Sequence, residues 1–341
     1  MGSVNWSRTR SWDSDTRTLT LLDHQNSDPN SAVTSSSTTT YNARGNILAR
    51  RYYRDTANPG RVSTADSYSY DAQGNPLTQR YYADGDVGST VTNALAMTYD
   101  AQGHRLTQRY YADGDVGSTV TNAYAYTYDA QGNRLTQSYH LYGDVGSEIT
   151  SAYAYTYDDR GNQLTSRRYG SGGVGSPVLD SIAYSYDAQG HQLTQRYYGN
   201  GDIDSLITSA AASTYDAQGN QLTQRYYAYG NIGSQVTSAS LYTYDAQGNQ
   251  ITLRIYANGE IGSSPITASG SITYDARGNP LTKRYYVGDI GTTIDFAYVY
   301  TYDAEGNQLT ETGYGSGGIG STITSYTEDR DYAPVLQPML F

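Results

Sequence analysis

The sequence has no cysteine, one lysine, two phenylalanines and two tryptophans among its 341 residues. Without cysteine, neither disulfides nor thiolate chemistry are available. The lysine, Lys283, lies in no glycine-rich phosphate-binding loop. No nucleophile, base and orienting acid come together at a recognisable spacing. The sequence therefore predicts neither an enzyme nor a cofactor.

Long apolar runs and an excess of positive charge are also lacking. No run approaches the roughly 18 residues that a membrane-spanning helix needs, so no membrane span is predicted. The formal net charge of −11 argues against nucleic acid as a partner. Residues 1–8 lack the apolar core of a signal peptide. We nevertheless expect an extracellular or cell-surface protein: either it leaves the cell by another route, or the first residues are not the native start.

What the chain has in abundance is tyrosine, with 39 copies, and a fixed period. A Tyr-Asp-type motif recurs every 29 residues, apart from one step of 30 that the following step of 28 corrects. Its first residues are Tyr41, Tyr70, Tyr99, Tyr128, Tyr157, Tyr186, Tyr215, Tyr244, Tyr274 and Tyr302. Such a period indicates a tandem-repeat architecture, in which each unit is buried only against its neighbours.

One unit reads as two strands and two turns. Asp100-Ala101-Gln102-Gly103 has the order of a type I turn followed by a left-handed glycine, which is typical of a hairpin with a bulge. The segments on either side are rich in Thr, Tyr and Val and alternate with period two. We predict an all-β, elongated ribbon or spiral of antiparallel hairpins, with about twenty strands. A parallel β-solenoid with one unit per coil is the alternative.

The pairing around the first hairpin and the core can be drafted from the sequence. Asp129 is expected opposite Asn133, Thr127 opposite Leu135, and Tyr126 opposite Thr136. Tyr124, Tyr126 and Tyr128 should share one face, and Ala123, Ala125 and Thr127 the other. Three aliphatic ladders, which begin at Leu48, Val87 and Val62 and repeat with the period, are expected to form a thin core with the tyrosines.

The ends of the chain depart from the period. Residues 1–40 read as an N-terminal extension, with a strand-like segment at 16–22 and a Ser/Thr-rich linker at 26–40. Residues 41–325 hold the ten repeats, and 326–341 form an apolar tail. Trp6 and Trp12 suggest that the N-terminal end docks on something.

Two groups of residues could bind a ligand, although a polar turn explains the first and packing of the side chains on each other explains the second. Asp113-Gly114-Asp115 suits calcium, but Tyr142, Ser171 and Asn200 replace its first carboxylate in other units, so no metal site is predicted. His104 and His191 occupy the turn position of Asn133 and are interpreted as turn variants. The tyrosine columns with Arg80, Arg109, Arg196 and Arg225 could stack polysaccharide, but mutual packing of the rings, covered by Arg, is favoured.

The motif Tyr-Asp-x-x-Gly-Asn-x-Leu, preceded by Tyr-x as in Tyr126-Thr127-Tyr128-Asp129, resembles the YD repeat of Rhs-type proteins over residues 41 to about 325. The resemblance implies a long antiparallel ribbon that spirals, as a shell around toxin cargo or as a surface adhesin. The unit here is longer and more uniform than the usual one. The motif that closes an Rhs core, and a toxin domain behind it, are missing.

The function predicted from the sequence is structural. Open sheet ends attract another chain unless they are blunted, so we expect a subunit of an extracellular filament or sheath that assembles with itself by strand addition. The residues expected to carry assembly are Leu19, Leu21, Val335, Leu336, Leu340 and Phe341. The alternative is a ligand- or polysaccharide-binding adhesin, or a shell fragment of a YD-repeat toxin.

Overall fold

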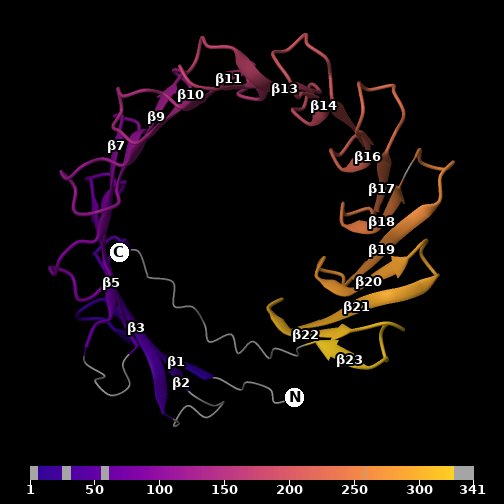
Figure 1. The fold of residues 1–341 in the computed structure, drawn as a ribbon. Helices are drawn as coiled ribbons and strands as arrows, with labels where there is room; N and C mark the ends of the chain where they lie inside the picture. The colour runs from indigo at the N-terminus through magenta and orange to yellow at the C-terminus, as the bar shows by residue number, and fades with distance from the viewer. Residues whose placement is uncertain (1–6, 25–31, 55–60, 258, 326–341) are drawn as a thin grey trace. The chain divides into compact units, whose positions relative to one another are not determined.

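A computed structural model describes residues 7–24, 32–54, 61–257 and 259–325 (Figure 1). The described residues contain strands and turns, with no helix. None of them therefore forms a helix that could cross a membrane. The chain divides into a first unit of residues 1–156 and 167–178 and a second unit of residues 157–166 and 179–341. The two units are described separately below.

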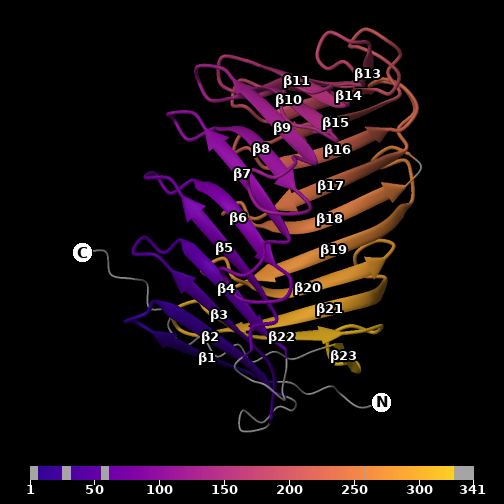
Figure 2. The same cartoon turned by 60° about the vertical axis from the view of Figure 1, so that its left-hand side comes forward.

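The first unit contains the strands β1 to β11, which follow one another along the chain (Figure 2). Their bounds are β1 Ser7–Asp13, β2 Thr18–His24, β3 Val33–Tyr41, β4 Ile47–Tyr53, β5 Thr64–Tyr70, β6 Pro76–Tyr82, β7 Asn93–Tyr99, β8 Arg105–Tyr111, β9 Asn122–Tyr128, β10 Arg134–Leu141 and β11 Ser151–Tyr157. Each strand pairs antiparallel with the next, from β1 with β2 to β10 with β11. The division between the units falls within β12, Gln163–Tyr169.

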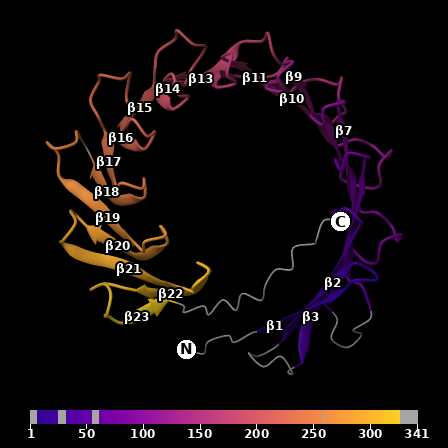
Figure 3. The same cartoon turned by 180° about the vertical axis from the view of Figure 1, so that it is seen from behind.

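The second unit continues the same pattern, and its strands β16 to β19 can be followed in chain order in Figure 3. The bounds are β13 Val178–Tyr186, β14 Gln192–Tyr198, β15 Ser209–Tyr215, β16 Gln221–Tyr227, β17 Ser238–Tyr244, β18 Gln250–Ala257, β19 Ile266–Tyr274, β20 Pro280–Val287, β21 Thr293–Tyr302, β22 Gln308–Tyr314 and β23 Ile323–Ser325. Neighbouring strands again pair antiparallel. The predicted all-β hairpin ribbon is confirmed, and the parallel solenoid is wrong.

The Tyr-Asp turn has the predicted geometry. The main-chain N–H of Asp129 donates to the carbonyl oxygen of Asn133 at 2.9 Å, and Gly132 has a φ of +88°. Oδ1 of Asp129 accepts the N–H groups of Gln131 and Asn133, while Asn133 Nδ2 donates to Oδ2. These hydrogen bonds, the Asn133 side chain first, hold the pKa of Asp129 below its ordinary value.

The predicted register is wrong by one residue beyond the turn. Tyr128 pairs with Arg134 and Thr127 with Thr136, so that Leu135 has no partner of its own. A β-bulge of this kind adds one residue to one strand and shifts every later pair. The two predicted faces are nevertheless confirmed, because the shift leaves β9 itself unchanged. We call the side with Tyr124, Tyr126 and Tyr128 the tyrosine face, and the side with Ala123, Ala125 and Thr127 the alanine face.

The core is built differently from the prediction. The leucine ladder at the bulge is half-exposed, with Leu48 at 39% and Leu309 at 42%. Most of the buried residues are instead small residues of one strand and aromatic residues of the next, on the alanine face, whereas the buried Tyr126 and Tyr300 lie on the tyrosine face. Examples are the cross-strand pairs Ala65–Tyr82, Ala94–Tyr111, Ala210–Tyr227, Ala239–Tyr256 and Ser269–Tyr286.

The other two aliphatic ladders pack against these pairs. In the second unit Val236 is buried with Ala210, Tyr227, Ala239 and Tyr256, and the partly buried Ile207, Ile232, Ile261 and Ile266 complete the cluster. Since these residues come from the second turn and its flanks, that turn covers the alanine face. Burying one such aliphatic side chain stabilises the fold by ~1.5–3 kcal/mol.

The segment before the first repeat is also more regular than expected. The Ser/Thr-rich linker is wrong for its second half, because Val33–Tyr41 form β3, which pairs with both β2 and β4. Trp12 lies 29 residues before Tyr41, and their rings lie 5.9 Å apart. In β1 and β2, Ser11 pairs with Thr20, the same offset as Thr127 with Thr136. The predicted division at residues 40 and 325 stays a prediction.

Candidate functional site

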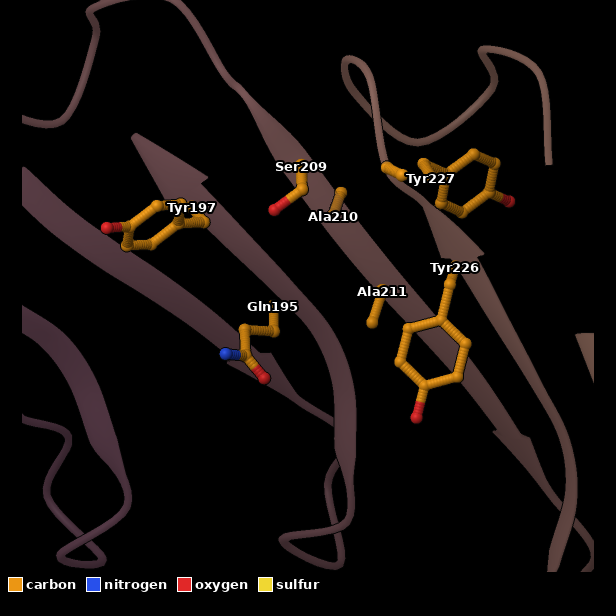
Figure 4. A pocket seen from close by; sticks show the side chains of 8 residues that line it. Gln195, Tyr197, Ser209, Ala210, Ala211, Tyr226 and Tyr227 are labelled. Atoms are coloured by element: carbon orange, nitrogen blue, oxygen red, sulfur yellow. The ribbon is translucent and has the colours of Figure 1, made fainter. Parts of the chain in front are cut away.

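The tyrosine face of the second unit carries a hollow of about 330 Å³ over β14 to β16 (Figure 4). Its lining is Gln195, Tyr197, Ser209, Ala210, Ala211, Tyr226, Tyr227 and Ala228. The methyl group of Ala211 lies on the floor between the side chains of Tyr197 and Tyr226. None of the lining residues is charged.

The hollow exists because a small residue replaces a large one in a repeated column. Ala211 pairs with Gln195 on one side and with Tyr226 on the other. In β9 the corresponding residue is Tyr124, which pairs with Gln108 and Tyr139. Its ring lies 6.1 Å from that of Tyr110 and 4.8 Å from that of Tyr139. The position that is empty in β15 is therefore filled by a tyrosine ring in β9.

The chemistry of the hollow is that of an aromatic stacking surface. The Tyr226 side chain is 42% exposed, and burial, followed by the neighbouring Tyr242, raises its pKa above the ordinary tyrosine value. The phenol is thus neutral at physiological pH and can both donate and accept hydrogen bonds. The amide of Gln195 adds a donor and an acceptor beside the rings. A flat, uncharged ligand with hydroxyl groups matches these features.

The arginines predicted to accompany the tyrosines lie on the other side of the sheet from the hollow. Arg80, Arg109, Arg196 and Arg225 are on the alanine face, and their Nε atoms donate to Asp115, Asp144, Asn231 and Glu260 at 2.5, 2.5, 3.0 and 2.9 Å. The expected packing of tyrosine rings on each other is confirmed by Tyr124 and Tyr139. The expected cover of tyrosine rings by these four arginines stays a prediction. On the tyrosine face the guanidinium of Arg105 lies 5.0 Å from the centre of the Tyr126 ring.

The histidines at the turn position act as predicted. Nδ1 of His104 lies 2.8 Å from Oδ2 of Asp100. In the next turn Nδ2 of Asn133 makes the same contact with Oδ2 of Asp129, at 3.0 Å. The imidazole also stacks on Tyr128 of the next repeat, with 5.0 Å between ring centres. His191 repeats both contacts with Asp187 and Tyr215. Within the described residues, no group of three or more His, Asp or Glu side chains could hold a metal ion.

The residues predicted to carry assembly are only partly described. Leu19 and Leu21 lie in β2, whose main chain pairs with β1 on one side and β3 on the other. An interior strand cannot complete a neighbour's sheet, so their predicted role as an added strand is corrected. Among the described residues, β1 pairs with β2 alone. Val335, Leu336, Leu340 and Phe341 lie outside the described residues.

Sequence reasoning missed the hollow and the alanine–tyrosine pairs. Both were detectable, because Ala123, Ala210 and Ala239 are spaced by multiples of the period. The alanine column is inconspicuous beside the aliphatic ladders, because alanine buries little area by itself. The loss of aromatic residues from Ala211 and Ser213 of β15 would also have been visible on alignment with Tyr124 and Tyr126.

Comparison with known proteins gives remote likenesses. No family model matches the chain, and no curated protein matches it. A crystal structure of TcdB2-TccC3 superimposes with a TM-score of 0.46 at 15% identity, over 91% of this chain and 19% of that one. A porin-like protein from Bacteroides uniformis gives a TM-score of 0.25 at 12% identity, over 92% and 93% of the two chains. The chain thus spans about a fifth of the TcdB2-TccC3 chain, and TM-scores below 0.5 support no conclusion about function.

Proposed function

We propose that the protein is a structural repeat protein that assembles with copies of itself at the cell surface or outside the cell. The observation that carries this proposal is the use of the repeat's polar side chains for contacts with the next repeat. The hydroxyl of Tyr128 donates to the carbonyl oxygen of Arg105 at 2.9 Å, and that of Tyr244 to Gln221 at 2.9 Å. The same bond recurs at Tyr70, Tyr186, Tyr215, Tyr274 and Tyr302.

Ion pairs join the repeats in the same manner on the alanine face. Arg51–Asp86, Arg80–Asp115, Arg109–Asp144, Arg225–Glu260 and Arg254–Asp289 each connect a strand to the second turn of the following repeat. Each pair is partly exposed and is worth little alone, ~0–1 kcal/mol. Their regular recurrence favours a role in holding repeats together over a role in chemistry.

The proposed assembly of copies into a filament depends on the outer edge of β1. Residues 10–13 of this strand are exposed, and among the described residues its second edge has no partner. A strand edge of this kind offers N–H and C=O groups to another chain. The assembly predicted from the sequence therefore moves from Leu19 and Leu21 to β1.

Sedimentation of the full chain over a range of concentrations tests this proposal. We expect oligomers that grow with concentration, and a Ser11→Lys and Trp12→Lys double variant, whose charges blunt the β1 edge, that stays monomeric with the same far-ultraviolet circular dichroism. Tyr142→Ser is the control, because its ring is 88% exposed in a turn remote from β1 in sequence. Assembly of this control should be unchanged. A full chain that stays monomeric at all concentrations would contradict the proposal.

Binding of a neutral polysaccharide is a second candidate function, favoured by the hollow at Ala211. The exposed ring of Tyr226 and the half-buried ring of Tyr197, over a small floor, suit the flat face of a β-linked pyranose, and Gln195 suits its hydroxyl groups. Cellohexaose is a suitable probe, measured by titration calorimetry. We expect Tyr226→Ala to weaken binding by about tenfold, since ~1.4 kcal/mol corresponds to that factor.

The control for this second function fills the hollow. Ala211→Tyr copies the natural arrangement at Tyr124 and should abolish binding while leaving the fold intact. Wild-type protein that binds neither cellohexaose nor any member of a neutral-glycan panel would eliminate polysaccharide binding. Self-assembly would be unaffected by that result, because it depends on β1.

A further inference from the structure

Tyrosines of neighbouring strands meet on the tyrosine face at β9 and β10. Tyr124 and Tyr139 stand directly opposite each other in the pairing of the two strands. Their ring centres are 4.8 Å apart and the ring planes are tilted by 31°. The separation is shorter than the 6.1 Å of Tyr110 and Tyr124 or the 6.3 Å of Tyr153 and Tyr155. Rings that are two apart on one strand are held farther apart by the strand's own rise.

The pair is accessible and has no other covalent means of being joined. Both residues are partly exposed to solvent. The chain lacks cysteine, and 39 of its 43 Tyr, Phe and Trp residues (39, 2 and 2) are tyrosine. Phenylalanine would supply the same apolar ring, but tyrosine alone among these gives a phenol that one-electron oxidants convert to a radical.

We infer that Tyr124 and Tyr139 form an oxidative cross-linking site, at which a dityrosine bond joins β9 to β10. The oxidant is a peroxide acting through a one-electron peroxidase. Each phenol loses one hydrogen atom, and the two radicals couple through ring carbons ortho to the oxygens. The two ring hydrogens at the new bond then move to the oxygens and restore both phenols. Overall, two tyrosines and one hydrogen peroxide give one dityrosine and two waters.

The proposed cross-link at Tyr124 and Tyr139 joins two residues of one chain, unlike a cross-link at a fully exposed tyrosine. Tyr142 and Tyr229 are each 88% exposed in second turns, so radicals formed there meet another molecule. Tyr124 and Tyr139 already lie in contact within one chain. Coupling between them is therefore independent of protein concentration, and the inference does not depend on the self-assembly proposed above.

The experiment treats the dilute full chain with a haem peroxidase and limiting hydrogen peroxide, and maps the monomer after trypsin digestion. Trypsin cleavage after Arg134 separates the two tyrosines into different peptides. We expect a linked pair of peptides that is lighter than their sum by two hydrogens, with the bond between Tyr124 and Tyr139. The cross-linked monomer should also melt at a higher temperature than the untreated protein.

Two variants make the test specific. Tyr139→Phe should remove the linked peptides, whereas Tyr142→Phe should retain them. The chain also contains a natural control, because Tyr285 stands opposite Phe296 with ring centres 4.3 Å apart. Phe296→Tyr should create a second link, between residues 285 and 296. Oxidised monomer without the 124–139 link, or Tyr139→Phe with undiminished dityrosine fluorescence, would overturn the inference.

Discussion

The tyrosine face differs between β8–β10 in the first unit and β14–β16 in the second. In the first region Tyr124 fills the space beside Tyr110 and Tyr139. In the second, Ala211 leaves a hollow beside Tyr197 and Tyr226. The Tyr-Asp turns and the small-residue–aromatic pairs of the alanine face are nearly the same in both. The repeat thus keeps its turns and its alanine face while the tyrosine face varies.

This difference separates residues that specify the fold from residues that are open to other uses. A left-handed turn glycine has no substitute without strain, and a buried alanine has no room to grow. Apart from buried residues such as Tyr126 and Tyr300, the tyrosine face is partly open to solvent, so it tolerates more change than the alanine face. A binding function is therefore more easily acquired on the tyrosine face than on the alanine face.

The largest expected effect tests the shared turns. Gly132→Val and Gly219→Val each place a side chain at a φ of +88°, which costs about 1–3 kcal/mol. In both, the new Cβ would also lie 2.6 Å from Nε2 of the preceding turn's histidine, His104 or His191. That clash should add about 1–3 kcal/mol. Chemical denaturation should show equal losses in the two variants, although they belong to different units.

A matched glycine separates the strain from the clash. Gly172 has a φ of +96°, but its nearest neighbour, Ser176 Cβ, would lie at an ordinary 3.6 Å. Gly172→Val should therefore cost only the strain, about 1–3 kcal/mol. A loss as large as that of Gly132→Val would show that packing between successive turns contributes nothing.

The next effect converts the first region into the second. Tyr124→Ala removes ring contacts with Tyr110 and Tyr139 and should lower the free energy of unfolding by about 1–3 kcal/mol. Tyr142→Ala, at a ring that is 88% exposed, should change it by less than about 0.5 kcal/mol. Equal melting temperatures for the two variants would mean that the tyrosine face does not stabilise the first unit.

Much of this architecture follows from the sequence, because the period repeats each signal many times. The Gly132 turn, the two faces of β9 and the antiparallel hairpins were all predictable from turn chemistry and alternation. The bulge at Leu135 was not predictable. It depends on how the turn joins the strand, and it shifts the register without changing the alternation of β9. That shift also explains why the leucine ladder was misjudged as core.

The candidate site was less predictable, because it arises from what is missing. A hollow needs both a small residue and large neighbours, and strand pairing decides which residues are neighbours. Arg109 shows the same limit: its partner Asp144 is 35 residues away, which is neither one period nor a local spacing. The composition shows that tyrosine is abundant, but only the strand register shows which rings are in contact.

Raising the pH should have a smaller effect on the free energy of unfolding, and it tests the tyrosines without replacing them. Burial, with the nearby Glu311 adding to it, raises the pKa of Tyr300 to about 12, from the ordinary 10.0. The folded protein thus holds this proton where the unfolded chain has lost it, so stability is full below pH 10 and falls as pH rises towards 12. The slope is at most about 1.4 kcal/mol per pH unit for one tyrosine.

Tyrosinate absorbance measured against pH, together with the free energy of unfolding, checks this expectation. Tyr300→Phe should reduce the loss of stability between pH 10 and 12. Burial also raises the pKa of Tyr124, so Tyr124→Phe should act in the same direction. If stability rose with pH in this window, the assignment of these phenols as protonated in the folded state would be wrong.

The smallest expected effect converts the second region into the first. Ala211→Tyr should place a ring between Tyr197 and Tyr226, gaining contacts of ~0.5–1.5 kcal/mol and losing part of that to side-chain ordering. The net change should lie between zero and about 1 kcal/mol of stabilisation, measured by thermal and chemical denaturation.

Ala210→Tyr is the matched control one residue away, on the opposite face of β15. Ala210 is 7% exposed and packs on Tyr227, so this change should overpack the core and destabilise the protein by about 1–3 kcal/mol. Equal effects of the two substitutions would mean that the two faces do not differ as described, and the hollow would lose its explanation.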